Sequence, residues 1–247
     1  MFGMNGLCDL IQYGGKEEDI ISHLFCFETA ASEKNENGIF PLHIAASNKN
    51  PEVVKLILDA YPEAASKKDK WGQFPLHKAA LYNNQDVVRI LLDAYPQAAA
   101  ETDNDGYLPL HRAAAYNENP DVVKMLLDTY PEAAAEKDKY GDLPLHHAAE
   151  CNENQEVVRI ILNAYPQAAV EKDNGGFLPK RYGDIYQTNT EVKQLLLTAT
   201  VREYRKNSAA KIIQRAWREC RYNPAYKMCE RVLERGVWES INIGDTV

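Results

Sequence analysis

Apolar and polar positions recur in long blocks along most of this chain. One block, Phe74 to Ala99, reads FPLHKAALYNNQDVVRILLDAYPQAA. Its apolar residues form two groups, one after Phe74 and one in the run VVRILL, with a polar break between them. Groups of this length and spacing predict two short helices per block. The second group is apolar almost all round, and such a helix needs packing neighbours on both sides.

The block is repeated with a nearly constant period. A glycine marks each copy, and an apolar residue and a proline follow it; in the first four copies the sequence continues as Leu-His. The glycines lie 34 or 35 residues apart, at Gly38, Gly72, Gly106, Gly141 and Gly176. The histidines are His43, His77, His111 and His146, and a Tyr-Pro pair closes each full copy at Tyr61, Tyr95, Tyr130 and Tyr165.

Residue types at the block boundaries predict where each helix begins and ends. Proline at the first helical position has its φ preset and needs no N–H partner. The first helix is expected to end near Asn83, Asn117 or Asn152, because asparagine tolerates a left-handed cap. The second helix is expected to end at Tyr-Pro, since a residue before proline is driven out of the helical region. The predicted N-caps of the second helices are Asn50, Asn84, Asn119 and Asn154.

Two short antiparallel helices cannot bury their apolar faces alone, so the copies must stack into a solenoid. The pattern resembles the ankyrin repeat, whose hallmark is Thr-Pro-Leu-His-x-Ala. Phe or Leu stands here in place of the threonine, and Tyr-Pro in place of the family's glycine after the second helix. The resemblance implies an all-α ankyrin-repeat solenoid of about four full repeats between two degenerate capping repeats, followed by a basic C-terminal helix.

The terminal copies depart from the pattern in a way that suits the ends of a stack. Arg181 replaces the histidine and Lys193 the second valine of the last copy, and a terminal repeat needs a polar outward face. We therefore predict an ankyrin-repeat domain, a basic helical segment and a tail, at 1–206, 207–235 and 236–247. The domain comprises a cap at 7–37, full repeats at 38–71, 72–105, 106–140 and 141–175, and a cap at 176–206.

A histidine in a distinctive tetrapeptide suggests chemistry, but its repetition argues against it. One histidine per repeat places each a full repeat from the next, so no two can share a metal ion. Each imidazole is expected to hydrogen-bond to backbone across the turn or in the adjacent repeat. His147 and Cys151 have metal-ligand spacing on a helix, but two ligands are weak evidence, and we predict no metal and no cofactor. Without a phosphate loop, a nucleophile–base pair or clustered carboxylates, we expect no enzyme.

By the ankyrin resemblance, a protein partner binds the concave face formed by the turn tips and the first helices. The positions that differ between the copies lie beside the turn glycine and along the first helix. Several are aromatic, and Trp and Tyr are enriched at interface hot spots. An alternative for Tyr82 and Tyr116 is packing on the neighbouring first helix. The predicted contact residues are Trp71, Gln73, Lys78, Tyr82, Tyr107, Arg112, Tyr116, Tyr140, Asp142 and His147.

Charge divides the chain into an acidic body and a basic segment. Residues 1–200 carry 18 Lys+Arg and 30 Asp+Glu, whereas residues 201–235 carry 10 and 4. The acidic body favours a partner with a basic patch and disfavours nucleic acid. No apolar run is long enough for membrane insertion, and the five scattered cysteines indicate a reducing compartment. We expect a monomer in the cytoplasm, with the nucleus as a second location.

The basic segment contains KIIQRAWRECRYN and resembles an IQ motif, the helix that calmodulin-like EF-hand proteins clasp. Ile213, Gln214 and Arg218 match its first, second and sixth positions. Glu219 and Asn223 depart from the seventh and eleventh. The match is therefore partial.

Three interpretations of this segment remain open. Ser208 is the expected N-cap of its helix. In an EF-hand complex, Trp217 would enter the apolar groove while Arg218 and Arg221 meet the acidic rim. The basic helix could equally fold back onto the acidic repeats. Contact with a membrane surface or with nucleic acid is the third interpretation.

These features together predict a non-enzymatic scaffold or adaptor. It would bind a protein partner through the concave face and use the IQ-like helix as a second docking site. The alternative is a regulatory or inhibitory subunit of an enzyme, or a mimic of a host factor, with the C-terminal helix folded back on the repeats.

Overall fold

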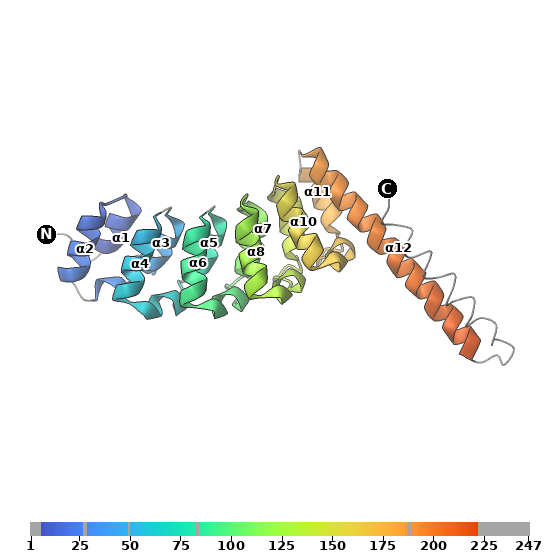
Figure 1. Cartoon of the computed structure of the whole chain (residues 1–247), viewed down its shortest axis with the longest axis horizontal. Coiled ribbons are helices and arrows are strands. Elements are labelled where there is room, and N and C mark those ends of the chain that lie inside the picture. Colours follow the sequence, from blue (N-terminus) through green and yellow to red (C-terminus); the bar gives the residue numbers. More distant parts are fainter. Residues whose placement is uncertain (1–5, 27–28, 49, 83, 187–188, 222–247) are drawn as a thin grey trace. The chain divides into compact units, whose positions relative to one another are not determined.

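A computed structural model of the chain describes residues 6–26, 29–48, 50–82, 84–186 and 189–221, apart from the side chains of residues 213 and 215–221. The described residues form helices and turns, with no strand among them (Figure 1). The chain divides into two compact units, Met1–Thr200 and Val201–Val247.

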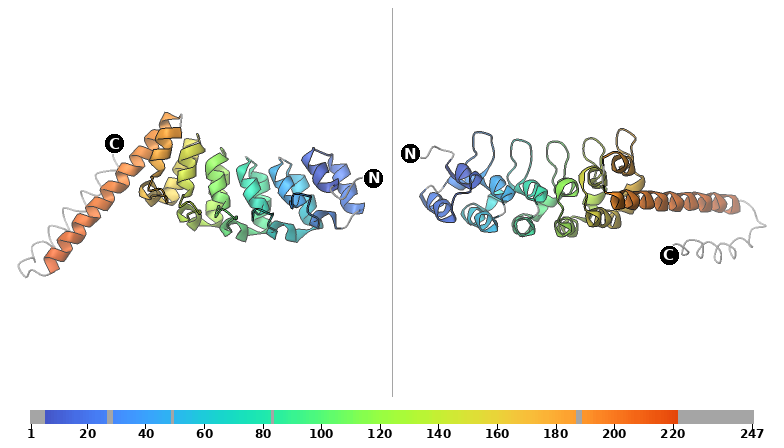
Figure 2. Two further views of the ribbon diagram at one scale, coloured as in Figure 1. Left: turned by 180° about the vertical axis from the view of Figure 1, so that it is seen from behind. Right: turned by 90° about the horizontal axis from the view of Figure 1, so that it is seen from above.

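The first unit is a stack of helix pairs. The first helices lie side by side along it, and the turns between pairs project on one side (Figures 1 and 2). These first helices are α1 (Gly6–Gln12), α3 (Pro41–Ser47), α5 (Pro75–Leu81), α7 (Pro109–Tyr116), α9 (Pro144–Cys151) and α11 (Pro179–Tyr186). The second helices are α2 (Glu17–Cys26), α4 (Pro51–Ala60), α6 (Gln85–Ala94), α8 (Pro120–Thr129), α10 (Gln155–Ala164) and α12 (Thr190–Arg221). The prediction of an all-α repeat solenoid is confirmed.

The helix boundaries follow the local chemistry that predicts them. A proline opens each first helix from α3 to α11. The predicted N-caps act as expected: the Asn50 side chain accepts the backbone N–H of Glu52 at 3.0 Å, and Asn84, Asn119 and Asn154 cap their helices in the same way. Each of these second helices ends just before its Tyr-Pro pair.

Beyond Tyr-Pro, the chain forms a short 3-10 helix that the sequence pattern does not predict. Each of these helices buries an Ala-Ala pair against the core, as Ala64 and Ala65 do in the first. They are η2 (Pro62–Ser66), η3 (Pro96–Ala100), η4 (Pro131–Ala135) and η5 (Pro166–Val170). The segment between repeats is therefore part of the core as well as a linker.

The expectation of left-handed asparagine caps after the first helices is wrong. The φ angles of Asn117 and Asn152 are −91° and −93°, in the extended region. Both side chains are buried and donate to carbonyl groups of the preceding repeat: Asn117 to Ala80 at 2.9 Å and Asn152 to Ala114 at 3.0 Å. These asparagines therefore join neighbouring repeats instead of reversing the chain. Asn83 lies outside the described residues.

The core runs without a break through the stack. It contains the Leu and Ala residues of the first helices and the Val-Val and distal apolar pairs of the second helices. The apolar sequence of the second helices had suggested burial on all sides, but the structure shows otherwise. In α6, Arg89 and Asp93 are exposed and Ile90 is half-buried, so one face meets solvent.

The last second helix continues because its stop signal is missing. Thr200-Val201 stands where the other repeats have Tyr-Pro, and α12 runs for 32 residues to Arg221. Ser208 lies inside this helix, so the prediction that it caps a separate helix is wrong. Among the described helices, none combines the length and apolar character needed to cross a membrane.

Successive turns touch closely at their glycines. Gly141 has φ +81°, and a Cβ added there would lie 2.5 Å from Asn174 Oδ1 and 2.7 Å from the Asn174 backbone nitrogen. That nitrogen donates to the Tyr140 carbonyl at 3.1 Å. Gly176 has the same φ, but a Cβ there would meet nothing within 4 Å. Both glycines therefore need the left-handed backbone conformation, but Gly141 also lies in close contact with the next turn.

We expect Gly141→Ala to cost more stability than Gly176→Ala. Both substitutions place alanine in the left-handed region, at about 1–2 kcal/mol. Gly141→Ala also forces apart two hydrogen-bonded turns, which adds about 1–3 kcal/mol. Urea unfolding followed by circular dichroism compares the two, and equal costs would mean that contact between turns contributes nothing.

Candidate functional site

A buried aspartate organises each of the four turns that precede α5, α7, α9 and α11. At the turn before α7, Asp103 Oδ1 accepts the backbone N–H groups of Asp105 at 2.9 Å and Tyr107 at 3.0 Å. Its other oxygen, Oδ2, accepts from Arg112 on α7 at 2.9 Å. One carboxylate oxygen therefore stabilises the turn, and the other oxygen joins the turn to the first helix.

The same aspartate recurs, but its helical partner changes from turn to turn. The partner always lies nine residues after the aspartate. The pairs are Asp69 with Lys78 at 3.9 Å, Asp103 with Arg112 at 2.9 Å, Asp138 with His147 at 2.8 Å, and Asp173 with the Tyr182 hydroxyl at 2.7 Å. Lys78, Arg112 and His147 were predicted to contact a partner protein. In the structure, these side chains are largely buried and face an aspartate of their own repeat.

Hydrogen bonds lower the pKa of two of these buried carboxylates, Asp103 and Asp138. Burial alone would raise the pKa of Asp103, but hydrogen bonds from Arg112 and the turn backbone hold it below its usual value. His147 and the turn backbone do the same for the pKa of Asp138. Asp142, beside Gly141, behaves in the opposite way. Burial is the main reason that its pKa is raised to about 6, and the Asp138 carboxylate adds to the effect.

Two further predicted contact residues also have internal roles. Gln73 is buried and donates to Asp103 Oδ2 at 3.2 Å, which links two successive turns. Tyr107 is half-buried, with the Arg112 guanidinium 4.2 Å from its ring centre, and burial raises its pKa to about 12. These side chains support the turns more than they offer free surface.

Of the remaining five predicted contact residues, Asp142 is half-buried and the other four are exposed aromatic side chains. Trp71 is 44% exposed, Tyr82 45%, Tyr116 58% and Tyr140 57%. Trp71 and Tyr140 lie at turn tips, just before the glycine, and Tyr82 and Tyr116 lie at the ends of α5 and α7. We call the surface formed by the turns and the first helices the turn face.

Sequence reasoning missed exposed aromatic residues in the two caps. Tyr13 follows α1 by one residue, as Tyr82 follows α5, and it is 81% exposed. Tyr186 ends α11 as Tyr116 ends α7, and Phe177 follows the turn glycine as Tyr107 does. Extending the repeat alignment into the degenerate caps would have found them. The exposed aromatic positions therefore span the stack from α1 to α11.

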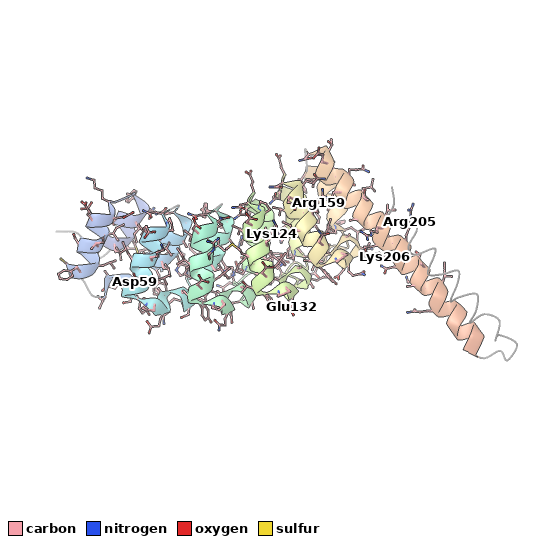
Figure 3. All side chains as sticks on the ribbon, in the orientation of Figure 1. Asp59, Lys124, Glu132, Arg159, Arg205 and Lys206 are labelled. Atoms are coloured by element: carbon pink, nitrogen blue, oxygen red, sulfur yellow. The ribbon has the colours of Figure 1, made fainter. Side chains whose placement is uncertain are left out.

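Charge is distributed differently on the two sides of the stack. On the second helices, exposed i,i+3 pairs recur, such as Lys124 with Asp121 at 3.3 Å and Arg159 with Glu156 at 3.4 Å (Figure 3). Such pairs are worth little energetically. On the turn face, Lys70 and Lys78 lie with their ammonium groups 4.3 and 5.1 Å from the Trp71 ring centre. The tip at Trp71 is thus aromatic and basic within an acidic chain.

The four recurrent histidines act as structural links, as predicted. The Nδ1 atom of His77 accepts the Phe74 N–H at 3.2 Å, at the start of its own helix. Because Nδ1 is an acceptor, Nε2 carries the proton and donates to the Tyr107 carbonyl of the next turn at 2.9 Å. The Nε2 atoms of His43, His111 and His146 reach the next turn in the same way. Each of these imidazoles therefore bonds to a backbone carbonyl of the next turn through Nε2.

Two groups of side chains have metal-ligand character within the described part of the chain. They are Asp138, Asp142 and His147, and Asp142, His146 and Asp173, with the ligand atoms of each group within 4.8 Å of one another. Cys151, considered with His147 from its spacing, belongs to neither group and is a free thiol.

The predicted IQ-like residues lie mostly where side chains are not described. The backbone of α12 includes them, and Gln214 is exposed. The side chains of Ile213, Trp217, Arg218 and Arg221 lie outside the described residues, as does the remainder of the segment to residue 235 and the tail at 236–247.

Comparison with known proteins identifies the repeat. A family model described as ankyrin repeats, in three copies, matches residues 7–102 and 95–173. The matched region begins at residue 7 and ends at residue 173, within the last predicted full repeat. No curated protein matches the chain.

We expect stability to fall as pH falls from 6.5 towards 4. Burial lowers the pKa of His43, His77 and His146 to about 4 and that of His111 to about 3. Between these values and 6.5, the unfolded chain binds protons that the folded chain does not. Each such proton removes about 1.4 kcal/mol of unfolding free energy per pH unit. Asp142, whose folded pKa is raised, offsets one histidine between about pH 6 and 4.

Urea unfolding at several pH values measures this slope. His77→Gln should be less stable at pH 7 and should show a slope smaller by about one proton. An unchanged unfolding free energy between pH 6.5 and 5 would contradict the assignment of these imidazoles as neutral links.

Proposed function

Since the chain belongs to the ankyrin-repeat family, we propose that it is a non-enzymatic adaptor that binds a protein partner through the turn face. Ankyrin repeats are protein–protein interaction modules. The observation that carries the proposal is the set of exposed aromatic side chains on this face. Trp71 and Tyr140 at turn tips, with Tyr82 and Tyr116 at helix ends, offer apolar area that the fold does not use. Trp and Tyr in such positions commonly dominate binding energy.

The charges on individual turns predict the charges of the partner more specifically than the net charge of the chain does. The turn before α5 carries Lys67, Lys68 and Lys70, beside Trp71. The turn before α7 carries Glu101 and the exposed Asp105, with no lysine. A complementary partner would therefore place acidic or neutral groups opposite Trp71 and its basic patch opposite Asp105.

We expect Trp71→Ala with Tyr140→Ala to weaken partner binding strongly. Loss of one hot-spot aromatic costs about 2 kcal/mol or more, which is about 30-fold in Kd. The partner is first identified by quantitative affinity purification with the full chain, and its Kd is then measured with purified proteins. Phe25→Ala is the matched control, because Phe25 is 88% exposed but lies on α2, a second helix.

The thermal midpoint of the double variant decides between binding and packing. A midpoint near that of the unsubstituted chain, with weakened binding, supports the proposal. A large fall would mean that both aromatics are packing residues, and unchanged binding would exclude the turn face. If the partner is an enzyme whose activity falls when the chain is added, the chain is a regulatory or inhibitory subunit rather than an adaptor.

We further propose that α12 is a second docking site, for a calmodulin-like EF-hand protein. The observation favouring it is that α12 continues as one helix through the IQ-like residues, with Ile212 69% exposed on it. An apolar side chain open on a basic helix suits the groove and the acidic rim of an EF-hand partner.

Trp217 fluorescence tests this docking in the full chain. Of the three tryptophans, Trp71 and Trp238 are replaced by phenylalanine, so that Trp217 alone reports. Calmodulin at micromolar concentration, with or without calcium, should shift its emission to shorter wavelength as the ring leaves water. Ile213→Ala with Gln214→Ala should abolish the shift, and no shift in either condition would exclude this partner.

A further inference from the structure

The turn before α9 differs from the other turns at two positions at once. Where the equivalent aspartates meet Lys78, Arg112 or Tyr182, Asp138 meets His147. The residue after the turn glycine is Gln73, Tyr107 or Phe177 at the other three turns and Asp142 here. This turn therefore gains a carboxylate while it loses the permanent cation found at the two preceding turns.

The three side chains converge on one small space. His147 Nε2 lies 2.8 Å from Asp138 Oδ2, and the ligand atoms of Asp138, Asp142 and His147 all lie within 4.8 Å of one another. The Asp138 side chain has no exposed surface, and that of His147 is 15% exposed. Asp142 Oδ1 is buried and has no hydrogen-bond partner. A buried carboxylate oxygen without a donor is costly, and a cation would satisfy it.

Nearby lysines do not supply that cation. Lys137 pairs with Glu171 at 3.0 Å, and Lys139 donates to the Asn104 carbonyl. Asp173, on the next turn, adds negative charge and is bound to the Tyr182 hydroxyl. The pair of carboxylates is therefore faced by one imidazole, where the preceding turns have an ammonium or guanidinium group.

We propose that Asp138, Asp142 and His147 bind one divalent transition-metal ion, with Zn²⁺ the best match. One imidazole nitrogen and two carboxylate oxygens are ligands that Zn²⁺ accepts, and water completes the four-coordinate site. Ca²⁺ and Mg²⁺ prefer oxygen ligands alone. The 2.8 Å separation of His147 Nε2 and Asp138 Oδ2 suits bonds of about 2 Å from both atoms to a shared ion.

The surroundings hold two of the ligands in place. Asp138 Oδ1 accepts the backbone N–H groups of Tyr140 at 2.8 Å and Asp142 at 2.9 Å. Its Oδ2 faces His147 Nε2, and the ion would replace the proton between these two atoms. The His147 ring packs edge-on against Tyr107 and His111, with ring centres 5.2 and 5.6 Å apart. Such outer contacts orient metal ligands and are worth about 10–100-fold in affinity.

The second candidate group is less suited to a metal. His146 uses both nitrogens, accepting from the Leu143 N–H at 3.0 Å and facing the Phe177 carbonyl at 3.3 Å. Binding an ion there would break the link between α9 and the next turn. The ion is therefore assigned to His147 and not to His146.

Calorimetric titration of the chelator-treated full chain with Zn²⁺ tests the site without any binding partner, so its outcome is independent of the proposed function. We expect one ion per chain and a higher thermal midpoint when Zn²⁺ is present. His147→Arg supplies the residue found at position 112, and Asp142→Gln the residue found at position 73, so both variants should fold. Each should lower Zn²⁺ affinity about 100-fold.

Cys151→Ala is the matched control and should bind Zn²⁺ as the unsubstituted chain does. Loss of binding in Cys151→Ala, or unchanged binding in His147→Arg and Asp142→Gln, would place the ion elsewhere and overturn the proposal. Absence of binding to the folded, unsubstituted chain at high micromolar Zn²⁺ would also overturn it.

Discussion

A neutral imidazole joins each repeat to the next. It accepts a hydrogen bond at the start of its own helix, as His77 does from Phe74, and donates to the carbonyl of the following turn. In His77, His111 and His146 both nitrogens are used, so the ring fixes the turn relative to the helix and cannot carry a second proton without losing a bond. His43 makes only the onward bond. Together with the hydrogen bonds between successive turns and the continuous core, this link holds the turns in register and keeps the aromatic residues at their tips on one face.

The helix boundaries could be predicted from the sequence because they depend on residues close together in the chain. Proline at helix starts, asparagine N-caps and Tyr-Pro stops act within a few residues, so residue type decides them. Asn117 was misjudged because its partner, the Ala80 carbonyl, lies 37 residues away in another repeat. The sequence places Asp103 and Asp138 in turns, but their burial depends on contacts with α7 and α9 nine residues later in the chain.

Contacts with distant residues of the chain also divide the predicted contact residues into two classes. Comparison of the repeats with one another selects positions whose residue differs from copy to copy, but a position can differ for two reasons. Lys78, Arg112 and His147 vary because several donors can serve one buried carboxylate. Trp71 and Tyr140 vary at exposed tips, where the fold makes no demand on the side chain. The burial of a side chain shows which of the two reasons for variation applies to it. Burial cannot be read from a single sequence.

The last turn ends the series of links. Arg181 stands where an imidazole would donate onward, and its guanidinium lies 4.1 Å from the centre of the Phe177 ring. No described atom lies within 4 Å of a Cβ added at Gly176, whereas the earlier turn glycines meet the following turn closely. A repeat stack is a one-directional, head-to-tail interface, which in principle can extend from molecule to molecule into a filament. A further repeat placed on this turn would have to dock without the imidazole hydrogen bond that joins His146 to the Phe177 carbonyl.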